Sequence, residues 1–120
     1  MRQWQGKVLI VNFWATWCEP CREEMPGFIR AQRDLGSQGV QFVGIAVDQR
    51  DKVVPFVKEL GLNYPALIGG VEVVDVSKDL GNRLEALPFT VILDRKGRVA
   101  HTQLGPLKPG QLRSIIDNLL

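Results

Sequence analysis

Two continuous apolar segments, each followed by a helical pattern, constrain the fold of this chain more than any other feature of its sequence. Val8–Trp14 is almost entirely apolar, interrupted only by Asn12, and Val40–Val47 is a second run of the same kind. Runs of this length are typical of strands that are buried on both faces. Strands that alternate with helices usually pair in parallel, because each helix carries the chain back to the end of the sheet at which the previous strand began. We therefore predict an α/β fold.

The segments that follow these strands carry the periodicity of amphipathic helices. In Glu19–Leu35 the apolar residues recur at three- and four-residue spacing, and Gly36 and Gly39 come directly after. Lys52–Leu60 repeats the pattern and is closed by Gly61. Glycine after a periodic segment is a common helix stop. The first half of the chain is thus predicted to run strand, helix, strand, helix.

The C-terminal third of the chain predicts a hairpin and a helix. Phe89–Leu93 and Arg98–Leu104 flank the turn signal Asp-Arg-Lys-Gly at residues 94–97, a pattern that joins antiparallel strands. Gln111–Leu120 has the spacing of a terminal helix. Together with the parallel half of the chain, the hairpin predicts a central mixed sheet flanked by helices.

Two segments before this hairpin have ambiguous patterns. Tyr64–Ile68 is compatible with a short strand in spite of Pro65, and Val73–Leu80 is compatible with a helix. Neither pattern excludes the alternative.

Length and charge limit the possible functions. A chain of 120 residues suits one domain, which we expect to span residues 1–120 and to act as a monomer. Lysine and arginine number 15 against 13 acidic residues, and no five like charges are consecutive, so nothing predicts nucleic-acid binding. The apolar run at residues 8–11 is too short to span a bilayer. No signal-peptide pattern is present either, so we expect any native signal or anchor to be absent from this chain.

The chain has two cysteines, Cys18 and Cys21, and they lie three positions apart. This spacing does not suit the long-loop disulfides that stabilise small secreted domains. A zinc site needs at least three protein ligands, and the only histidine, His101, is distant in the sequence. We therefore expect neither a bound metal nor another cofactor.

The same spacing permits a reversible local disulfide. Residues three apart on a helix share one face, so the sulfurs of Cys18 and Cys21 can reach bonding distance. Cys18 is expected at the helix start, where free backbone N–H groups and the helix dipole favour its thiolate. The dipole alone stabilises the Cys18 thiolate by only about 0.3–1 kcal/mol, so hydrogen bonds from Cys21 to the Cys18 sulfur must add to this stabilisation. Pro20 has no N–H to donate, which is harmless in a first helical turn.

The expected chemistry is thiol–disulfide exchange. An exposed Cys18 thiolate attacks a partner's disulfide, and a shielded Cys21 then resolves the mixed disulfide. On the spacing alone, the alternative is that the two cysteines are small core residues that happen to be neighbours.

The stretch Asn-Phe-Trp-Ala-Thr-Trp-Cys-Glu-Pro-Cys at residues 12–21 resembles the thioredoxin superfamily, most closely its extracytoplasmic bacterial branch of TlpA, ResA and CcmG/DsbE. The likeness continues through Arg22–Pro26 and Leu87–Asp94 with Gly97. It implies a thioredoxin-like fold and a reductant in the periplasm or at the extracytoplasmic membrane face. Its substrates would be disulfide-containing proteins, for example in cytochrome c maturation or copper-site assembly, and a membrane thiol carrier would re-reduce it.

The resemblance also assigns roles around the cysteines. Pro88 matches the family's cis-proline, which packs beside the disulfide and leaves the backbone before it, at Leu87, free to pair with a bound polypeptide. With Trp17 at the surface and Pro20 between the cysteines, these are the expected substrate-binding residues. Pro26 matches a proline that kinks the helix in the superfamily, whereas the pattern alone would end the helix there.

Glu24 is the remaining candidate catalytic residue. Many thioredoxins have a buried aspartate six residues before the first cysteine, but this chain has Asn12, which cannot take a proton. Glu24 follows Cys21 by three residues at the edge of the buried helix face, and ResA-like proteins have a glutamate at the matching position. Partial burial should raise its pKa, so that it can accept a proton from Cys21. The alternative is a solvated helix glutamate like Glu23.

Two other functions compete with a disulfide reductase. Peroxiredoxins share the fold superfamily, but their nucleophile follows a Pro-x-x-x-Thr-x-x-Cys pattern, and this chain has Val11 and Ala15 at the proline and threonine positions. The second alternative is a non-catalytic partner-binding module. The intact Cys18 and Cys21 argue against it.

Overall fold

A five-stranded mixed sheet organises the computed structural model, which describes residues 4–69, 77–79, 82 and 86–120. The strand order is β3-β2-β1-β4-β5. β1 (Val8–Trp14) lies at the centre, parallel to β2 (Val40–Val47) and antiparallel to β4 (Phe89–Leu93). β3 (Ala66–Gly69) adds a parallel edge strand, and β5 (Val99–Leu104) completes the antiparallel hairpin. The predicted mixed sheet and its parallel half are confirmed.

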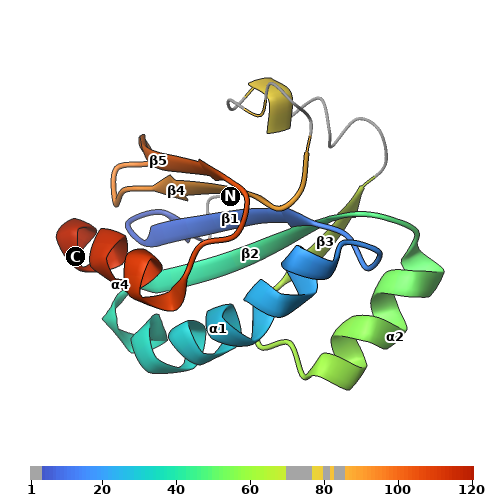
Figure 1. Ribbon diagram of the computed structural model, residues 1–120. Coiled ribbons are helices and arrows are strands. Elements are labelled where there is room, and N and C mark those ends of the chain that lie inside the picture. The colour runs from blue at the N-terminus through green and yellow to red at the C-terminus, as the bar shows by residue number, and fades with distance from the viewer. Residues whose placement is uncertain (1–3, 70–76, 80–81, 83–85) are drawn as a thin grey trace.

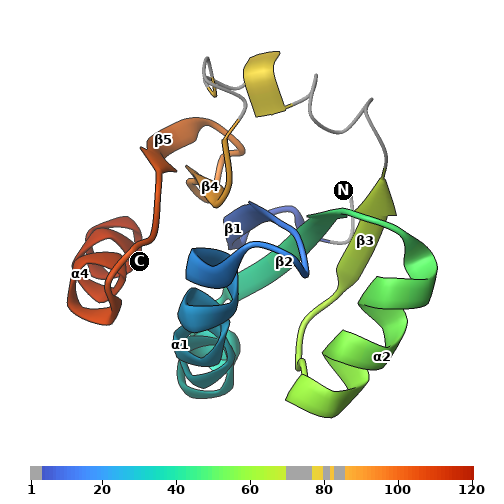
Figure 2. The same cartoon turned by 45° about the vertical axis from the view of Figure 1, so that its right-hand side comes forward.

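Three helices lie on one face of this sheet in both views of the ribbon (Figures 1 and 2). They are α1 (Glu19–Leu35), α2 (Arg50–Leu60) and α4 (Pro109–Leu119), and a short 3-10 turn at Gly36–Gln38 follows α1. α1 continues past Pro26, as the resemblance implied and the pattern alone did not.

The side chains of β1 alternate between the two faces of the sheet. Val8 and Ile10 pack in a cluster with residues of α1 and α4, and Trp14 packs in a cluster with residues of α1 and α2. Leu9, Val11 and Phe13 enter a third cluster with β4 on the other face. All seven residues of β1 are therefore buried, as its continuous apolar run predicted.

The structure corrects several predicted boundaries. α2 begins two residues before Lys52, because the carbonyl of Gln49 accepts hydrogen bonds from the first turn. α4 begins at Pro109, since proline suits the first helical position although it has no place in an apolar periodicity. β3 begins at Ala66 and not at Tyr64.

Only part of the predicted helix at Val73–Leu80 can be compared with the structure. Ser77–Asp79 are helical, and the rest of that segment lies outside the described residues.

Gly44 in β2 allows the sheet to approach two aromatic side chains. A Cβ atom at this position would lie 2.9 Å from Nε1 of Trp14 and 3.4 Å from Cε1 of Tyr64. Both aromatic residues are buried, so neither ring has free space into which it can retreat. The absence of a side chain at Gly44 is therefore required for Trp14 and Tyr64 to pack against β2.

We expect Gly44→Ala to lower the free energy of unfolding by about 1–3 kcal/mol, because the methyl group overpacks the core. Urea unfolding followed by circular dichroism measures this. Gly110→Ala is the matched control: its Cβ would meet nothing within 4 Å, and alanine should stabilise α4 by up to about 1 kcal/mol. Equal effects of the two substitutions would contradict this account.

Candidate active site

The two cysteines lie where the central strand passes into the first helix. β1 ends at Trp14, and the Cys18 amide donates to the Ala15 carbonyl at 3.2 Å, which closes a tight turn. Cys18 is the N-cap of α1 and Cys21 lies in its first turn. Their Cα atoms are 5.3 Å apart and their sulfurs form a disulfide. The local pair that the spacing predicted is present.

The exposure of the pair differs from what we expected. Cys21 is fully buried, as a resolving cysteine should be, but Cys18 is only 6% exposed in this disulfide form. The expectation of an exposed Cys18 is therefore wrong in degree, because Cys18 belongs to the core cluster of α1 and α2. The neighbouring Trp17 is exposed instead: 68% of its surface is accessible, and it presents an apolar surface beside the pair.

The start of α1 favours negative charge on Cys18. The backbone N–H of Cys21 donates to Sγ of Cys18 at 3.4 Å, the side-chain-to-backbone contact of a helix cap. The positive end of the helix dipole acts in the same direction, while the acidic Glu19 in the first turn opposes it. Pro20 is exposed in this turn. A thiolate formed at Cys18 on reduction would keep the amide as a donor.

Glu24, one helical turn after Cys21 in α1, is buried, with only 7% of its surface exposed. Its Oε2 accepts a 2.6 Å hydrogen bond from the amide of Leu107, and its Oε1 accepts a 3.1 Å bond from Nδ2 of Asn12. Burial raises the pKa of Glu24 to about 7, although the two hydrogen bonds partly offset the rise. The predicted burial and raised pKa of Glu24 are both confirmed, and the solvated alternative is excluded.

Asn12 connects this carboxyl group to the neighbouring strand β4. It is 1% exposed, and its Nδ2 also donates to Oγ1 of Thr90 at 3.0 Å. Thr90 and the Leu107 amide were not predicted from the sequence. The alignment of β1 with β4 pairs Asn12 with Thr90, so knowledge of the strand register would have identified the threonine. Nothing in the local sequence marks the Leu107 amide.

The loop before β4 lies against the cysteine cluster. The Leu87–Pro88 peptide bond is cis, as the resemblance implied. The side chain of Leu87 packs against the cluster that contains Cys18 and Cys21, and Pro88 is buried. The Pro88 carbonyl accepts a 2.8 Å hydrogen bond from the amide of Gly105. The structure thus brings all the predicted site residues to one end of β1.

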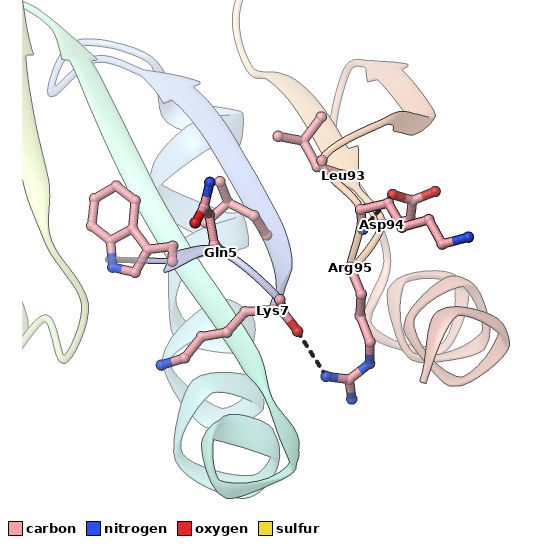
Figure 3. Close-up of a pocket in the computed structure, with 10 residues that line it drawn as sticks. Gln5, Lys7, Leu93, Asp94 and Arg95 are labelled. Carbon is pink, nitrogen blue, oxygen red and sulfur yellow. Dashed lines mark hydrogen bonds between the residues drawn. The ribbon is translucent and has the colours of Figure 1, made fainter. Parts of the chain in front are cut away.

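A separate pocket of about 480 Å³ lies at the opposite end of β1 (Figure 3). Lys7, Leu93 and Asp94 are among its lining residues, and Arg95 donates a 3.0 Å hydrogen bond to the Gly6 carbonyl there. The residues that line it include neither cysteine nor histidine. It is therefore not the redox site.

The described part of the chain holds no group of three or more metal-ligating side chains that could bind a metal ion. No helix within it combines the length and apolarity needed to cross a bilayer.

Comparisons with known proteins agree with the site. The family model for Redoxin matches residues 1–120. ResA of Bacillus subtilis, a thiol-disulfide oxidoreductase, is 29% identical over 114 residues, which cover 94% of this chain and 62% of ResA. The chain therefore spans about three fifths of the length of this relative.

Two solved structures share the fold over 98% of this chain. A thiol:disulfide interchange protein of the thioredoxin family from Chlorobium tepidum is 32% identical, with a TM-score of 0.90 and 83% of its own chain covered. A secreted thiol-disulfide isomerase from Corynebacterium glutamicum is 27% identical, with a TM-score of 0.89 and 73% covered. With a cysteine pair at the start of α1 and this family match over its whole length, the chain belongs to the Redoxin family and resembles its TlpA, ResA and CcmG branch.

Proposed function

We propose that this protein is a thiol-disulfide oxidoreductase that reduces disulfides in extracytoplasmic partner proteins. The observation that carries the proposal is a disulfide between Cys18 and Cys21 at the N-terminus of α1, with the buried carboxyl group of Glu24 one helical turn further along the same helix. Such a pair has the helix dipole and a backbone donor to stabilise one thiolate, and a proton acceptor near the other.

The proposed reaction has two exchange steps. In the reduced protein, the Cys18 thiolate attacks one sulfur of the partner's disulfide, so that a Cys18–partner bond forms and the partner's other sulfur leaves as a thiolate. Cys21, once deprotonated, attacks Sγ of Cys18 and releases the second partner thiolate. Two electrons pass to the partner, and the internal disulfide seen here is the product.

Glu24 is the proposed acceptor of the Cys21 proton. It follows Cys21 by one helical turn, and with a pKa of about 7 its carboxylate is available at neutral pH and still basic enough to take a proton. Asn12 and the Leu107 amide hold the carboxyl group by one oxygen each. Asn12 itself has no group that titrates, so Glu24 takes the place of the aspartate that other thioredoxins have.

The partner is proposed to bind over the surface beside Cys18, where α1 begins. Trp17 and Pro20 are exposed on one side of Cys18, and Leu87 with Pro88 lies on the loop that packs against the cysteine cluster. We further propose that the protein works outside the cytoplasmic membrane, which the secreted structural relative supports. A membrane thiol carrier is the proposed electron donor, and the protein is proposed to act as a monomer.

The competing functions have less support. A peroxidase of the peroxiredoxin type would need a threonine near the nucleophile, and Ala15 occupies that position. A non-catalytic binding module would not need a buried glutamate with a raised pKa behind an intact cysteine pair. Failure to consume hydrogen peroxide would agree with the first exclusion.

The reduction potential of the Cys18–Cys21 couple tests the direction of electron flow. Equilibration with dithiothreitol or glutathione couples, followed by counting of free thiols, gives the value. We expect a potential near that of thioredoxin, about −270 mV, or somewhat above it. A potential near that of DsbA, about −120 mV, would instead assign the protein as a disulfide donor.

The order of attack predicts different behaviour for the two serine variants. Reduced Cys21→Ser should accumulate a mixed disulfide with oxidised insulin, because nothing resolves the Cys18 adduct. Cys18→Ser should form none, since Cys21 is fully buried. Non-reducing electrophoresis and mass spectrometry identify the adducts. An adduct through Cys21 would reverse the assigned roles.

Replacement of Glu24 should change the pH dependence of disulfide exchange. We expect the rate of insulin reduction by the wild type to rise through pH 7 as Glu24 ionises. Glu24→Gln should lack this rise and be slower above pH 7 by about ten- to a hundredfold, at or below the usual range for general acid–base catalysis. Glu23→Gln, which changes an exposed neighbour, should keep the wild-type profile. Identical profiles for all three proteins would remove Glu24 from the mechanism.

Unfolding of the same proteins provides a control that does not depend on catalysis. The folded state keeps the Glu24 proton up to about pH 7, whereas an unperturbed glutamate releases it near pH 4.5. The folded state thus binds more protons between these values, so its stability must fall as the pH rises. Between pH 4 and pH 8 the oxidised wild type should lose about 3 kcal/mol relative to Glu24→Gln.

A further inference from the structure

Asn82 forms an unusual side-chain pairing just before the Leu87–Pro88 loop. Its Nδ2 donates to the Ala86 carbonyl at 2.7 Å, and its Oδ1 accepts from the Ala86 amide at 3.2 Å. In a sheet, two residues that exchange both backbone hydrogen bonds form such a pair. The side-chain amide of Asn82 therefore supplies the two hydrogen bonds that the Ala86 backbone would form with a neighbouring strand.

The orientation of this side chain is fixed from both sides. Asn82 is 1% exposed, its own amide donates to the Ser77 carbonyl at 3.0 Å, and its Nδ2 lies 3.4 Å from Oγ of Ser77. A rotated amide would place its oxygen against the Ala86 carbonyl and its NH₂ against the Ala86 N–H. Both of these contacts would be repulsive, so only the observed orientation satisfies Ala86.

Leu87 differs from its neighbours Ala86 and Pro88 in the hydrogen bonding of its backbone. The Pro88 carbonyl is bonded to the Gly105 amide, and proline has no N–H. Among the residues that the structure describes, none forms a hydrogen bond with the backbone of Leu87. Backbone groups without an internal partner need water or another chain. An added polypeptide strand supplies such bonds in many complexes.

We propose that Asn82 is a positioning residue for the partner polypeptide: it fixes Ala86 so that the adjacent backbone of Leu87 is held ready to pair with the partner beside Cys18. This inference rests on the proposed function, because it assumes that the partner is a protein disulfide. Asn82 touches neither the cysteines nor the partner. Its effect passes through Ala86 to the binding loop.

Substrates of different size test the role. A protein disulfide such as insulin can pair with the Leu87 backbone, whereas the small disulfide 5,5′-dithiobis(2-nitrobenzoic acid) has no backbone to pair. With dithiothreitol as reductant, we expect Asn82→Ala to raise KM for insulin about five- to tenfold, as loss of one or two hydrogen bonds implies, with kcat held within about twofold. The rate with the small disulfide should also stay within about twofold of the wild type.

Two further variants guard against a purely structural effect. Asn63→Ala removes another asparagine that donates to a backbone carbonyl, that of Ile29 at 3.0 Å, and should change neither rate. Asn82→Asp keeps the acceptor for the Ala86 amide and loses the donor, so it should give an intermediate KM and serves if Asn82→Ala does not fold.

The outcomes separate this inference from the proposed function. Unchanged KM in both Asn82 variants, or a parallel loss with both disulfides, overturns the positioning role alone. A wild type that reduces neither disulfide overturns the proposed function itself. A KM effect confined to insulin supports the role of Asn82.

Discussion

The complete burial of β1 is the constraint on which the rest of the structure depends. A strand that is apolar on both sides has to lie at the centre of the sheet, with a neighbour on each edge and a packed layer on each face. The chain can leave such a strand only at its end, and here it turns at once into α1. The cysteine pair is therefore attached to a buried strand that is paired on both edges.

One polar residue interrupts this strand, and its consequences extend through the site. The buried amide of Asn12 needs partners, and it finds Glu24 on α1 and Thr90 on β4. Glu24 in turn bonds Leu107, in the segment that leads into α4. Three parts of the chain that are distant in sequence thus meet around one carboxyl group. The same burial that makes this group costly to ionise also gives it a pKa suited to proton transfer.

The sequence predicted those features that rest on local pattern. The apolar run of β1, the glycine after α2 and the cysteine spacing each have a direct physical meaning within a few residues. The resemblance added the cis bond before Pro88 and the continuation of α1 past Pro26, which local pattern alone would have misjudged.

The contacts that depend on how distant segments align in the fold could not be predicted from the sequence. The bond from Asn12 to Thr90 requires the alignment of β1 with β4, and the bond from the Leu107 amide to Glu24 requires the path of an irregular segment. The low exposure of Cys18 also depends on packing, because helix periodicity places the residue but does not say what covers it.

The pKa of Glu24 connects the protein to the acidity of its surroundings. Because burial raises this pKa to about 7, the ionised fraction of Glu24 changes with pH in the neutral range and falls as the surroundings become more acidic. Under the proposed mechanism, the supply of electrons to partner proteins would slow in an acidified compartment with no change in the amount of protein. The activity proposed for this protein would then follow the acidity of the compartment in which it works.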